Sequence, residues 1–213
     1  MIEFLMYLVF GAALGTLGGI FGIGGGLIAI PLLGVLCGLD QQIAQGTALV
    51  MVVPNVMLAL WRYHQRNKIE LRHALPLASM GFCFAWLGSI WAVGIDAQTM
   101  RIGFVAFLVA LSAYNLVRMF YASAPASSQM NYSWPWLGVL GAASGTMGGL
   151  FGVGGAVVAT PVLTSLFGTT QVVAQGLSLA LALPSTGVTL VTYAVHHQVD
   201  WMVGVPLAIG GLL

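Results

Sequence analysis

The sequence is poor in charged residues, which make up 5% of the chain, whereas hydrophobic residues make up 59% and the mean hydropathy is +0.99. A soluble domain carries about 25% charged residues, because it needs a hydrated surface around its core. So few charged residues cannot form a hydrated surface around a globule of 213 residues. The composition therefore predicts an all-α integral membrane protein. The expected partners include the lipid bilayer but no nucleic acid, since a net charge of +1 leaves no basic patch.

The chain also lacks the groups of common membrane and soluble enzymes. No Asp, Glu, Lys or Arg occupies the middle of a long apolar segment, and buried carboxylates are the usual proton relays of pumps. Cys37 and Cys83 lie in apolar runs without metal-ligand spacing, which is typical of small packed side chains. The sequence has no zinc-protease motif, no Cys-x-x-Cys and no nucleophile elbow. We therefore expect no enzyme activity, no catalytic residue, no metal and no cofactor.

Apolar segments follow one another along the chain, and about 17–25 residues are needed for one crossing. About seven can be drawn, over residues 4–36, 43–61, 74–95, 102–121, 134–167, 172–195 and 201–213. The last is too short to cross, so the sequence looks cut off within a helix. Because the first residues lack the basic region of a cleaved signal peptide, the first helix is expected to stay. A polar stretch predicts the organisation 1–121 first transmembrane repeat, 122–133 linker and 134–213 second repeat, incomplete at its C-terminus.

The two halves resemble each other. An offset of 130 aligns residues 11–83 with 141–213 without a gap, and about 28 of the 73 pairs are identical. The identical pairs include glycines, prolines such as Pro31 and Pro161, and the glutamines Gln45 and Gln175. Chance matches between apolar segments would not favour these residue types together. The offset therefore predicts an internal repeat, and repeats with Gly/Pro-interrupted segments are typical of secondary transporters.

The basic residues indicate how the halves are oriented. Four of the six, Arg62, Arg66, Lys68 and Arg72, fall in one loop, which the positive-inside rule places in the cytoplasm of a cell inner (plasma) membrane protein. The equivalent loop, 194–201, has no Lys or Arg. This favours inverted halves with three crossings each, in which the glycine-rich segment re-enters the membrane. A parallel repeat with four crossings per half is the alternative.

Residues 18–26 and 148–156 are unusually rich in glycine. Each glycine inside a helix costs about 1 kcal/mol relative to alanine, so these segments predict a broken helix. Opened backbone within a membrane is tolerated where it is buried in protein or lines a wet cavity, and a restarting helix turns its positive end toward an anion. Close helix packing is the other interpretation, since many of these glycines are spaced as G-x-x-x-G. We assign packing to Gly11, Gly15, Gly141 and Gly145, and the break to Gly22, Gly24, Gly25, Gly152, Gly154 and Gly155.

Neutral polar residues within the apolar segments could donate hydrogen bonds to an oxyanion without holding it by charge. Gln45 and Gln175 are equivalent under the offset, and Asn55 and Ser185 directly follow Pro54 and Pro184. For Thr and Ser, a bond to the backbone of their own helix is the alternative. The predicted substrate-binding set is Thr16, Gly22, Gly24, Gly25, Gln45, Asn55, Thr146, Gly152, Gly154, Gly155, Gln175 and Ser185.

The paired Gly-Gly-x-x-Gly-x-Gly-Gly segments, each followed by Pro-x-Leu and then Gln-Gly, resemble the sulfite exporter TauE/SafE family. The resemblance covers both halves and implies a membrane permease of about eight spans. It also implies a secondary transporter that exports a small anion, sulfite or an organosulfonate, and places the site at the glycine segments. A channel-like anion pore and a non-transporting membrane scaffold remain alternatives, and a homodimer stays open. Length is the expected departure from the family pattern, since the sequence looks cut off before the last span of the second half.

Overall fold

The computed structural model describes residues 2–21, 25–67, 69–121 and 134–213, so the expected linker at 122–133 lies outside the described residues. The described residues form nine α-helices and no strand, which confirms the all-helical class. The helices are α1 (Ile2–Phe21), α2 (Gly26–Leu36), α3 (Gln41–Arg66), α4 (Leu71–Gly94), α5 (Ala97–Tyr121), α6 (Trp134–Phe151), α7 (Ala156–Ser165), α8 (Gln171–Val195) and α9 (Trp201–Leu212).

Four of these helices are long and apolar enough to cross a membrane, namely α3, α4, α5 and α8. At 1.5 Å per residue, the 26 residues of α3 extend about 39 Å, more than the hydrocarbon core of about 30 Å. The other five are shorter or contain shorter apolar stretches. The difference from seven apolar segments arises because 4–36 and 134–167 each form two helices.

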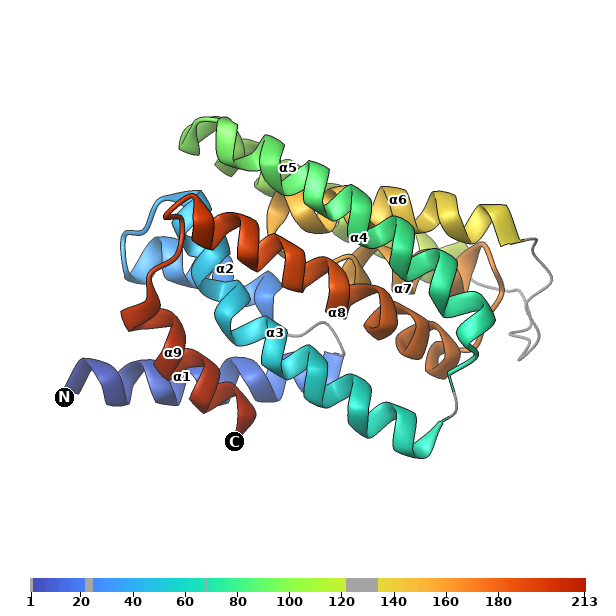
Figure 1. Ribbon diagram of the computed structural model, residues 1–213, viewed down its shortest axis with the longest axis horizontal. Helices are drawn as coiled ribbons and strands as arrows, with labels where there is room; N and C mark the ends of the chain where they lie inside the picture. Colours follow the sequence, from blue (N-terminus) through green and yellow to red (C-terminus); the bar gives the residue numbers. More distant parts are fainter. Residues whose placement is uncertain (1, 22–24, 68, 122–133) are drawn as a thin grey trace.

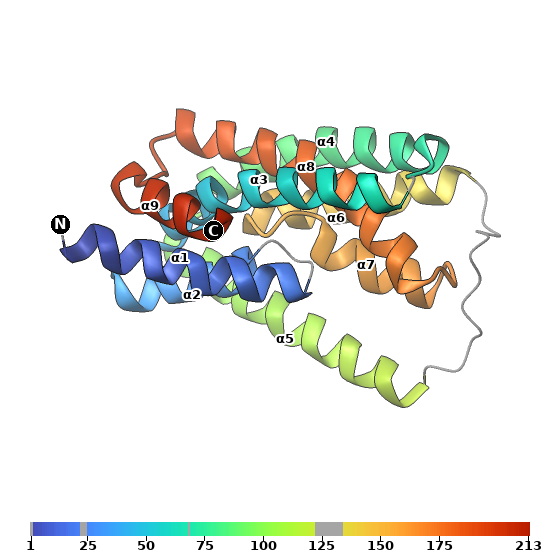
Figure 2. The ribbon, with the colours of Figure 1, turned by 90° about the horizontal axis from the view of Figure 1, so that it is seen from below.

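The helices lie roughly along one common axis (Figure 1). Figure 2 shows that α1 runs inward from the end that holds the N-terminus, and that α2 runs back toward this end. It also shows that α6 starts at the opposite end, and that α7 returns toward that end. Two helical hairpins therefore enter the bundle from opposite ends, beside the long helices.

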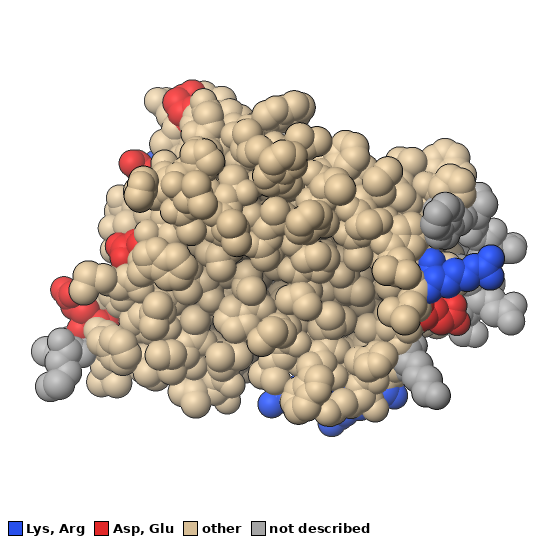
Figure 3. Space-filling model, in the orientation of Figure 1, with Lys and Arg blue, Asp and Glu red and all other residues tan. Residues whose placement is uncertain are grey.

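Acidic and basic side chains gather at opposite ends of the axis (Figure 3). We call the end with the N-terminus the acidic end, since it carries Glu3, Asp40, Asp96 and Asp200 at helix starts and turns. We call the other the basic end, and it carries Arg62, Arg66, Arg72 and Arg118. Arg101 and Glu70 are the exceptions. On the face drawn in Figure 3, most of the stretch between the two ends carries no charged side chain, as a bilayer requires.

Glycines let α6 lie directly on α4. A Cβ atom built on Gly145 would lie 2.8 Å from the Cα of Gly81, and one on Gly141 would lie 2.5 Å from the Leu77 carbonyl oxygen. Real Cβ atoms do not approach so closely, so these two positions require glycine. Such close backbone contact is a main source of helix association in lipid. The predicted packing role of Gly141 and Gly145 is thereby confirmed.

The contact between α1 and α9 has the same construction. A Cβ on Gly15 would lie 2.6 Å from the Cα of Gly211, and one on Gly11 would lie 2.9 Å from the Cα of Leu207. The two contacts are equivalent under the offset of 130. Gly15 corresponds to Gly145 and Gly211 corresponds to Gly81, since 145 − 15 = 130 and 211 − 81 = 130. The packing role predicted for Gly11 and Gly15 is therefore also confirmed.

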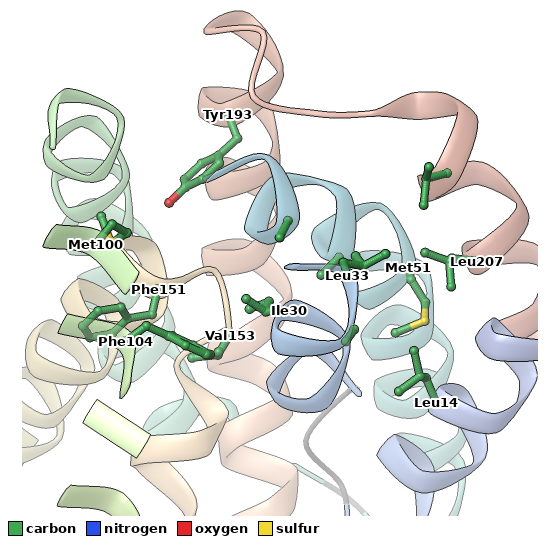
Figure 4. Close-up of a cluster of buried hydrophobic side chains, with 14 of the residues drawn as sticks. Leu14, Ile30, Leu33, Met51, Met100, Phe104, Phe151, Val153, Tyr193 and Leu207 are labelled. Carbon is green, nitrogen blue, oxygen red and sulfur yellow. The ribbon is translucent and has the colours of Figure 1, made fainter. Parts of the chain in front are cut away.

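The largest cluster of buried apolar side chains lies where the two hairpins meet the long helices (Figure 4). Ile30 of α2 and Val153, between α6 and α7, lie near each other in this cluster. Phe151 at the end of α6 stacks on Phe107 of α5 with ring centroids 4.8 Å apart. The cluster fixes the position of the turn between α6 and α7.

Candidate functional site

Both glycine-rich segments interrupt a helix, as the sequence predicts. In the second half α6 ends at Phe151 and α7 begins at Ala156, while Gly152 and Gly154 have φ angles of 68° and 71°. In the first half α1 ends at Phe21 and α2 begins at Gly26, and Gly25 has a φ of 79°. Side chains disfavour this left-handed region, whereas glycine occupies it freely. Gly22 and Gly24 lie outside the described residues.

Gly155 is required for a different reason, namely that there is no room for a side chain. Its φ is −62°, which any residue can adopt. A Cβ on Gly155 would lie 3.0 Å from the Ser144 carbonyl oxygen of α6, just as one on Gly25 would lie 2.8 Å from the Leu14 carbonyl oxygen of α1. In both halves, therefore, the start of the second helix of the hairpin is packed tightly against the first helix.

The two breaks adjoin each other and the long helices. A Cβ on Gly26 would lie 3.8 Å from the Gly152 carbonyl oxygen, so the start of α2 is next to the break between α6 and α7. A Cβ on Gly152 would lie 3.0 Å from the Cβ of Gln45 in α3, and one on Gly154 would lie 2.7 Å from the Cγ2 of Thr186 in α8. The break of the second half thus has α2, α3 and α8 around it.

The N-terminus of α7 is buried without a cap. No side chain accepts a hydrogen bond from its first turn, and the carbonyl of Gly155 accepts only from the N–H groups of Val158 and Ala159. Ala156 and Val157 are 4% and 5% exposed, and their N–H groups have no acceptor among the described residues. A buried helix start of this kind is available to a ligand that accepts hydrogen bonds.

Gln45 lies beside the break, where its Cβ is 3.0 Å from a Cβ built on Gly152, and it is fully buried. Its Oε1 accepts a hydrogen bond of 2.8 Å from the hydroxyl of Tyr193, which also lies 3.2 Å from the Leu150 carbonyl oxygen. The Gln45 Nε2 has no hydrogen-bond partner in the described part of the chain. A buried donor without a partner is costly, so this amide is available to a bound anion.

Tyr193 was not among the predicted site residues, although it is fully buried and donates to the Gln45 amide oxygen. Sequence reasoning missed this contact because Tyr193 and Gln45 are 148 positions apart in the chain. The signal that could have found it is the repeat, because Tyr193 is equivalent to Tyr63 under the offset of 130 and both are kept as tyrosine.

Three predicted residues use their hydroxyls within their own helices. Thr16 is exposed and donates to the Ala12 carbonyl at 2.8 Å, and Thr146 donates to the Ala142 carbonyl at 2.8 Å. Ser185 is buried and donates to the Ala182 carbonyl at 3.0 Å. These bonds match the alternative interpretation of Thr and Ser in apolar helices. Of the predicted residues near the break, the Gln45 amide and the backbone are therefore the free donors. The Ser144 hydroxyl is also buried without a partner among the described residues, and the Ser144 carbonyl packs on Gly155.

Two predicted residues remain, one in α3 and one in α8. Asn55 of α3 is half-buried against α9, where a Cβ on Gly211 would lie 2.8 Å from its Nδ2, and its Oδ1 has no partner among the described residues. Gln175 of α8 is half-buried, toward the basic end. Within the described ranges, no three His, Cys, Asp or Glu side chains are grouped as a metal site would require.

An all-helical chain with four apolar helices of membrane-spanning length and two interrupted helical hairpins has the architecture of a multi-pass membrane transporter. Comparison with known proteins gives the particular family. The chain belongs to the sulfite exporter TauE/SafE family, whose model matches residues 7–213. The predicted family is thereby confirmed, and transport is the shared activity that its name states.

Relatives in two domains of life carry matching names. The chain is 32% identical over 210 residues to a probable membrane transporter protein of Xylella fastidiosa strain 9a5c, covering 95% of this chain and 77% of that protein. It is 28% identical over 171 residues to a probable membrane transporter protein of Methanocaldococcus jannaschii, covering 76% and 63%. No solved structure matches the chain.

A plant relative carries the family name itself. The sulfite exporter TauE/SafE family protein 3 of Arabidopsis thaliana is 28% identical over 108 residues, covering 51% of this chain and 22% of that protein. The shared part is thus about half of this chain. The curated relatives therefore agree on membrane transport as a class.

Proposed function

We propose that the protein is a secondary transporter of the inner membrane that exports a small anion, sulfite or an organosulfonate, and binds it at the break between α6 and α7. The family name supports sulfite and its chemical relatives as the substrate class. These anions carry several oxygen atoms on one sulfur, each an acceptor of hydrogen bonds. The site must therefore present several donors together and few acceptors.

One observation carries the proposal, namely the uncapped start of α7. The N–H groups of Ala156 and Val157 are buried, have no acceptor among the described residues, and lie at the positive end of a helix dipole. The free Nε2 of Gln45, whose side chain packs on Gly152 in the same break, adds a third donor. An anion accepting these bonds would satisfy groups that otherwise stay unpaired.

The repeat supports a transporter mechanism of the inverted-repeat type. The hairpins α1–α2 and α6–α7 enter from opposite ends, and each packs through glycines on a helix of the other half, α1 on α9 and α6 on α4. These are the relations expected of two halves exchanged by a two-fold axis in the membrane plane. The basic end would then face the cytoplasm by the positive-inside rule.

Sulfite flux in proteoliposomes tests the site. We expect Gln45→Leu to lower the saturable sulfite flux by about tenfold to a hundredfold, because a hydrogen bond to a charged group contributes about 1.5–3 kcal/mol. Gln98→Leu is the matched control, since Gln98 is exposed near the start of α5. Equal flux in both variants and in the wild type would remove Gln45 from the site.

The same vesicles separate the alternative functions. A carrier shows counterflow, in which sulfite or sulfoacetate inside the vesicle stimulates uptake of labelled sulfite, whereas a channel-like pore does not. A scaffold that does not transport shows no flux of either anion and no ligand-induced thermal shift. Counterflow that is lost in Gln45→Leu and kept in Gln98→Leu is the result that the proposal predicts.

A further inference from the structure

Two Tyr–Gln pairs occupy equivalent places in the two halves, but only one pair is joined. Tyr193 of α8 donates to Gln45 of α3 at 2.8 Å. The equivalent donor and acceptor under the offset of 130 are Tyr63 of α3 and Gln175 of α8. Tyr63 instead donates to the Val172 carbonyl at 2.6 Å. The side-chain amide of Gln175 has no hydrogen bond among the described residues. The two pairs are thus in different states in one structure.

The pairs lie toward opposite ends of the bundle. Gln45 is in the second turn of α3 and Tyr193 in the last turn of α8, so this pair is toward the acidic end. Tyr63 is in the last turn of α3 and Gln175 in the second turn of α8, so that pair is toward the basic end. Each pair lies between the same two helices, at one end of their shared contact.

The joined pair is also the buried one. Tyr193 and Gln45 have no exposed surface, whereas Tyr63 and Gln175 are half-buried. Next to the joined pair, the turn before α9 packs on the second turn of α3. There the Asp200 N–H donates to the Thr47 hydroxyl at 2.9 Å.

The equivalent contact at the basic end is made differently. Gly46 of α3 packs on the backbone of Gln198, in the turn between α8 and α9. Gly176 of α8, its equivalent, packs on the ring of Tyr63, where a Cβ would lie 2.7 Å from the Tyr63 Oη. The phenol of Tyr63 therefore lies along α8 and bonds its backbone instead of reaching Gln175. The acidic end is closed by side chains and a turn, and the basic end is not closed by its Tyr–Gln pair.

We propose that Tyr193–Gln45 and Tyr63–Gln175 are the two alternate gates of this transporter, and that the bonded acidic-end pair and the unbonded basic-end pair mark a state with the first gate shut and the second open. This inference rests on the proposed function, since only an alternating carrier needs two gates. In the opposite state Tyr63 would donate to Gln175, and Tyr193 would leave Gln45. The switch as a whole exchanges one tyrosine–glutamine bond for the other, which keeps the two states close in free energy.

Sided thiol labelling of the full chain tests the gates without any substrate. Thr189→Cys and Ala59→Cys lie one helical turn inward from Tyr193 and Tyr63, and 189 − 59 = 130 makes them matched reporters. They are made in a Cys37→Ser, Cys83→Ser background and exposed to an impermeant thiosulfonate from one side at a time. We expect Ala59→Cys to react from the basic side at least fivefold faster than Thr189→Cys reacts from the acidic side.

Removing one hydroxyl should then shift the reporters in opposite directions. Tyr193→Phe should raise the labelling of Thr189→Cys from the acidic side by at least fivefold, and Tyr63→Phe should lower it. Tyr114→Phe is the control, because the Tyr114 hydroxyl bonds Ser165 away from both gates. Gln45→Met removes the same bond from the other side, and should act like Tyr193→Phe if that variant does not fold.

The outcomes separate the gates from the transport site. If Tyr193→Phe and Gln45→Met change the labelling of Thr189→Cys no more than Tyr114→Phe does, the gates are overturned, even where sulfite flux in the wild type is intact. If the labelling shifts as expected and no sulfite flux is found, the gates stand and the choice of substrate fails.

Discussion

The contact between α4 and α6 allows a quantitative test of how this bundle is held together. A Cβ on Gly145 would lie 2.8 Å from the Gly81 Cα and would overlap the Gly81 carbonyl oxygen. In Gly145→Ala the helices must move apart by roughly half an ångström or more to restore ordinary contact, and a gap of that size removes about a quarter to a half of each neighbouring contact energy. Overpacking of this kind costs about 1–3 kcal/mol.

The control is Gly187→Ala in α8, because a Cβ on Gly187 meets nothing within 4 Å. Alanine also favours the helix by up to about 1 kcal/mol relative to glycine, and this gain applies to both variants. We therefore expect Gly145→Ala to be about 1–3 kcal/mol less stable than Gly187→Ala. Unfolding of the full chain in mixed micelles by a graded fraction of dodecyl sulfate, followed by tryptophan fluorescence, measures the difference. Equal midpoints for the two variants would refute close backbone packing as the source of the association.

Two further predictions concern the turns. Gly154→Ala should be less stable than Gly168→Ala by about 1–3 kcal/mol in the same unfolding assay. Both positions have a positive φ, 71° and 64°, but only at Gly154 would the new Cβ meet a neighbour, 2.7 Å away. Equal losses of stability in the two variants would show that backbone strain alone sets the cost. Hydrogen bonds from the backbone and side chain of Thr99 lower the pKa of Asp96 below its usual 3.8. A lowered folded pKa means stability that is present above pH 3.8 and lost as the pH falls through the folded pKa. The thermal midpoint of the wild type should therefore drop more steeply than that of Asp96→Asn on acidification below about pH 4, and parallel curves would contradict this.

Local backbone chemistry made the helix breaks predictable from the sequence. Five or more glycines within nine residues cost a helix several kcal/mol in total, and no tertiary contact is needed to see this. The structure places the breaks between Phe151 and Ala156 and between Phe21 and Gly26. The packing glycines were predictable for a related reason, because G-x-x-x-G spacing puts small residues on one face of a helix.

The polar contacts were not predictable in the same way. The bond between Gln45 and Tyr193 joins residues 148 positions apart, and it depends on how α3 and α8 are rotated about their axes. Rotation is set by packing against all neighbouring helices, which periodicity does not encode when every face is apolar. For the same reason the sequence could not show that Thr16 is exposed, whereas Gln45 is fully buried.

The scarcity of charge within the bundle has a consequence for transport. At 4 Å, a fixed cation would attract an anion by about 4 kcal/mol at an effective dielectric constant of 20, which slows release roughly a thousandfold. A helix N-terminus carries about half an elementary charge, so the start of α7 would supply about half of that attraction. The Gln45 amide adds direction without adding net charge. A site built from these groups can take an anion out of water and still release it on the other side. One arginine in the same place would bind the anion so strongly that its release, and therefore transport, would be slow.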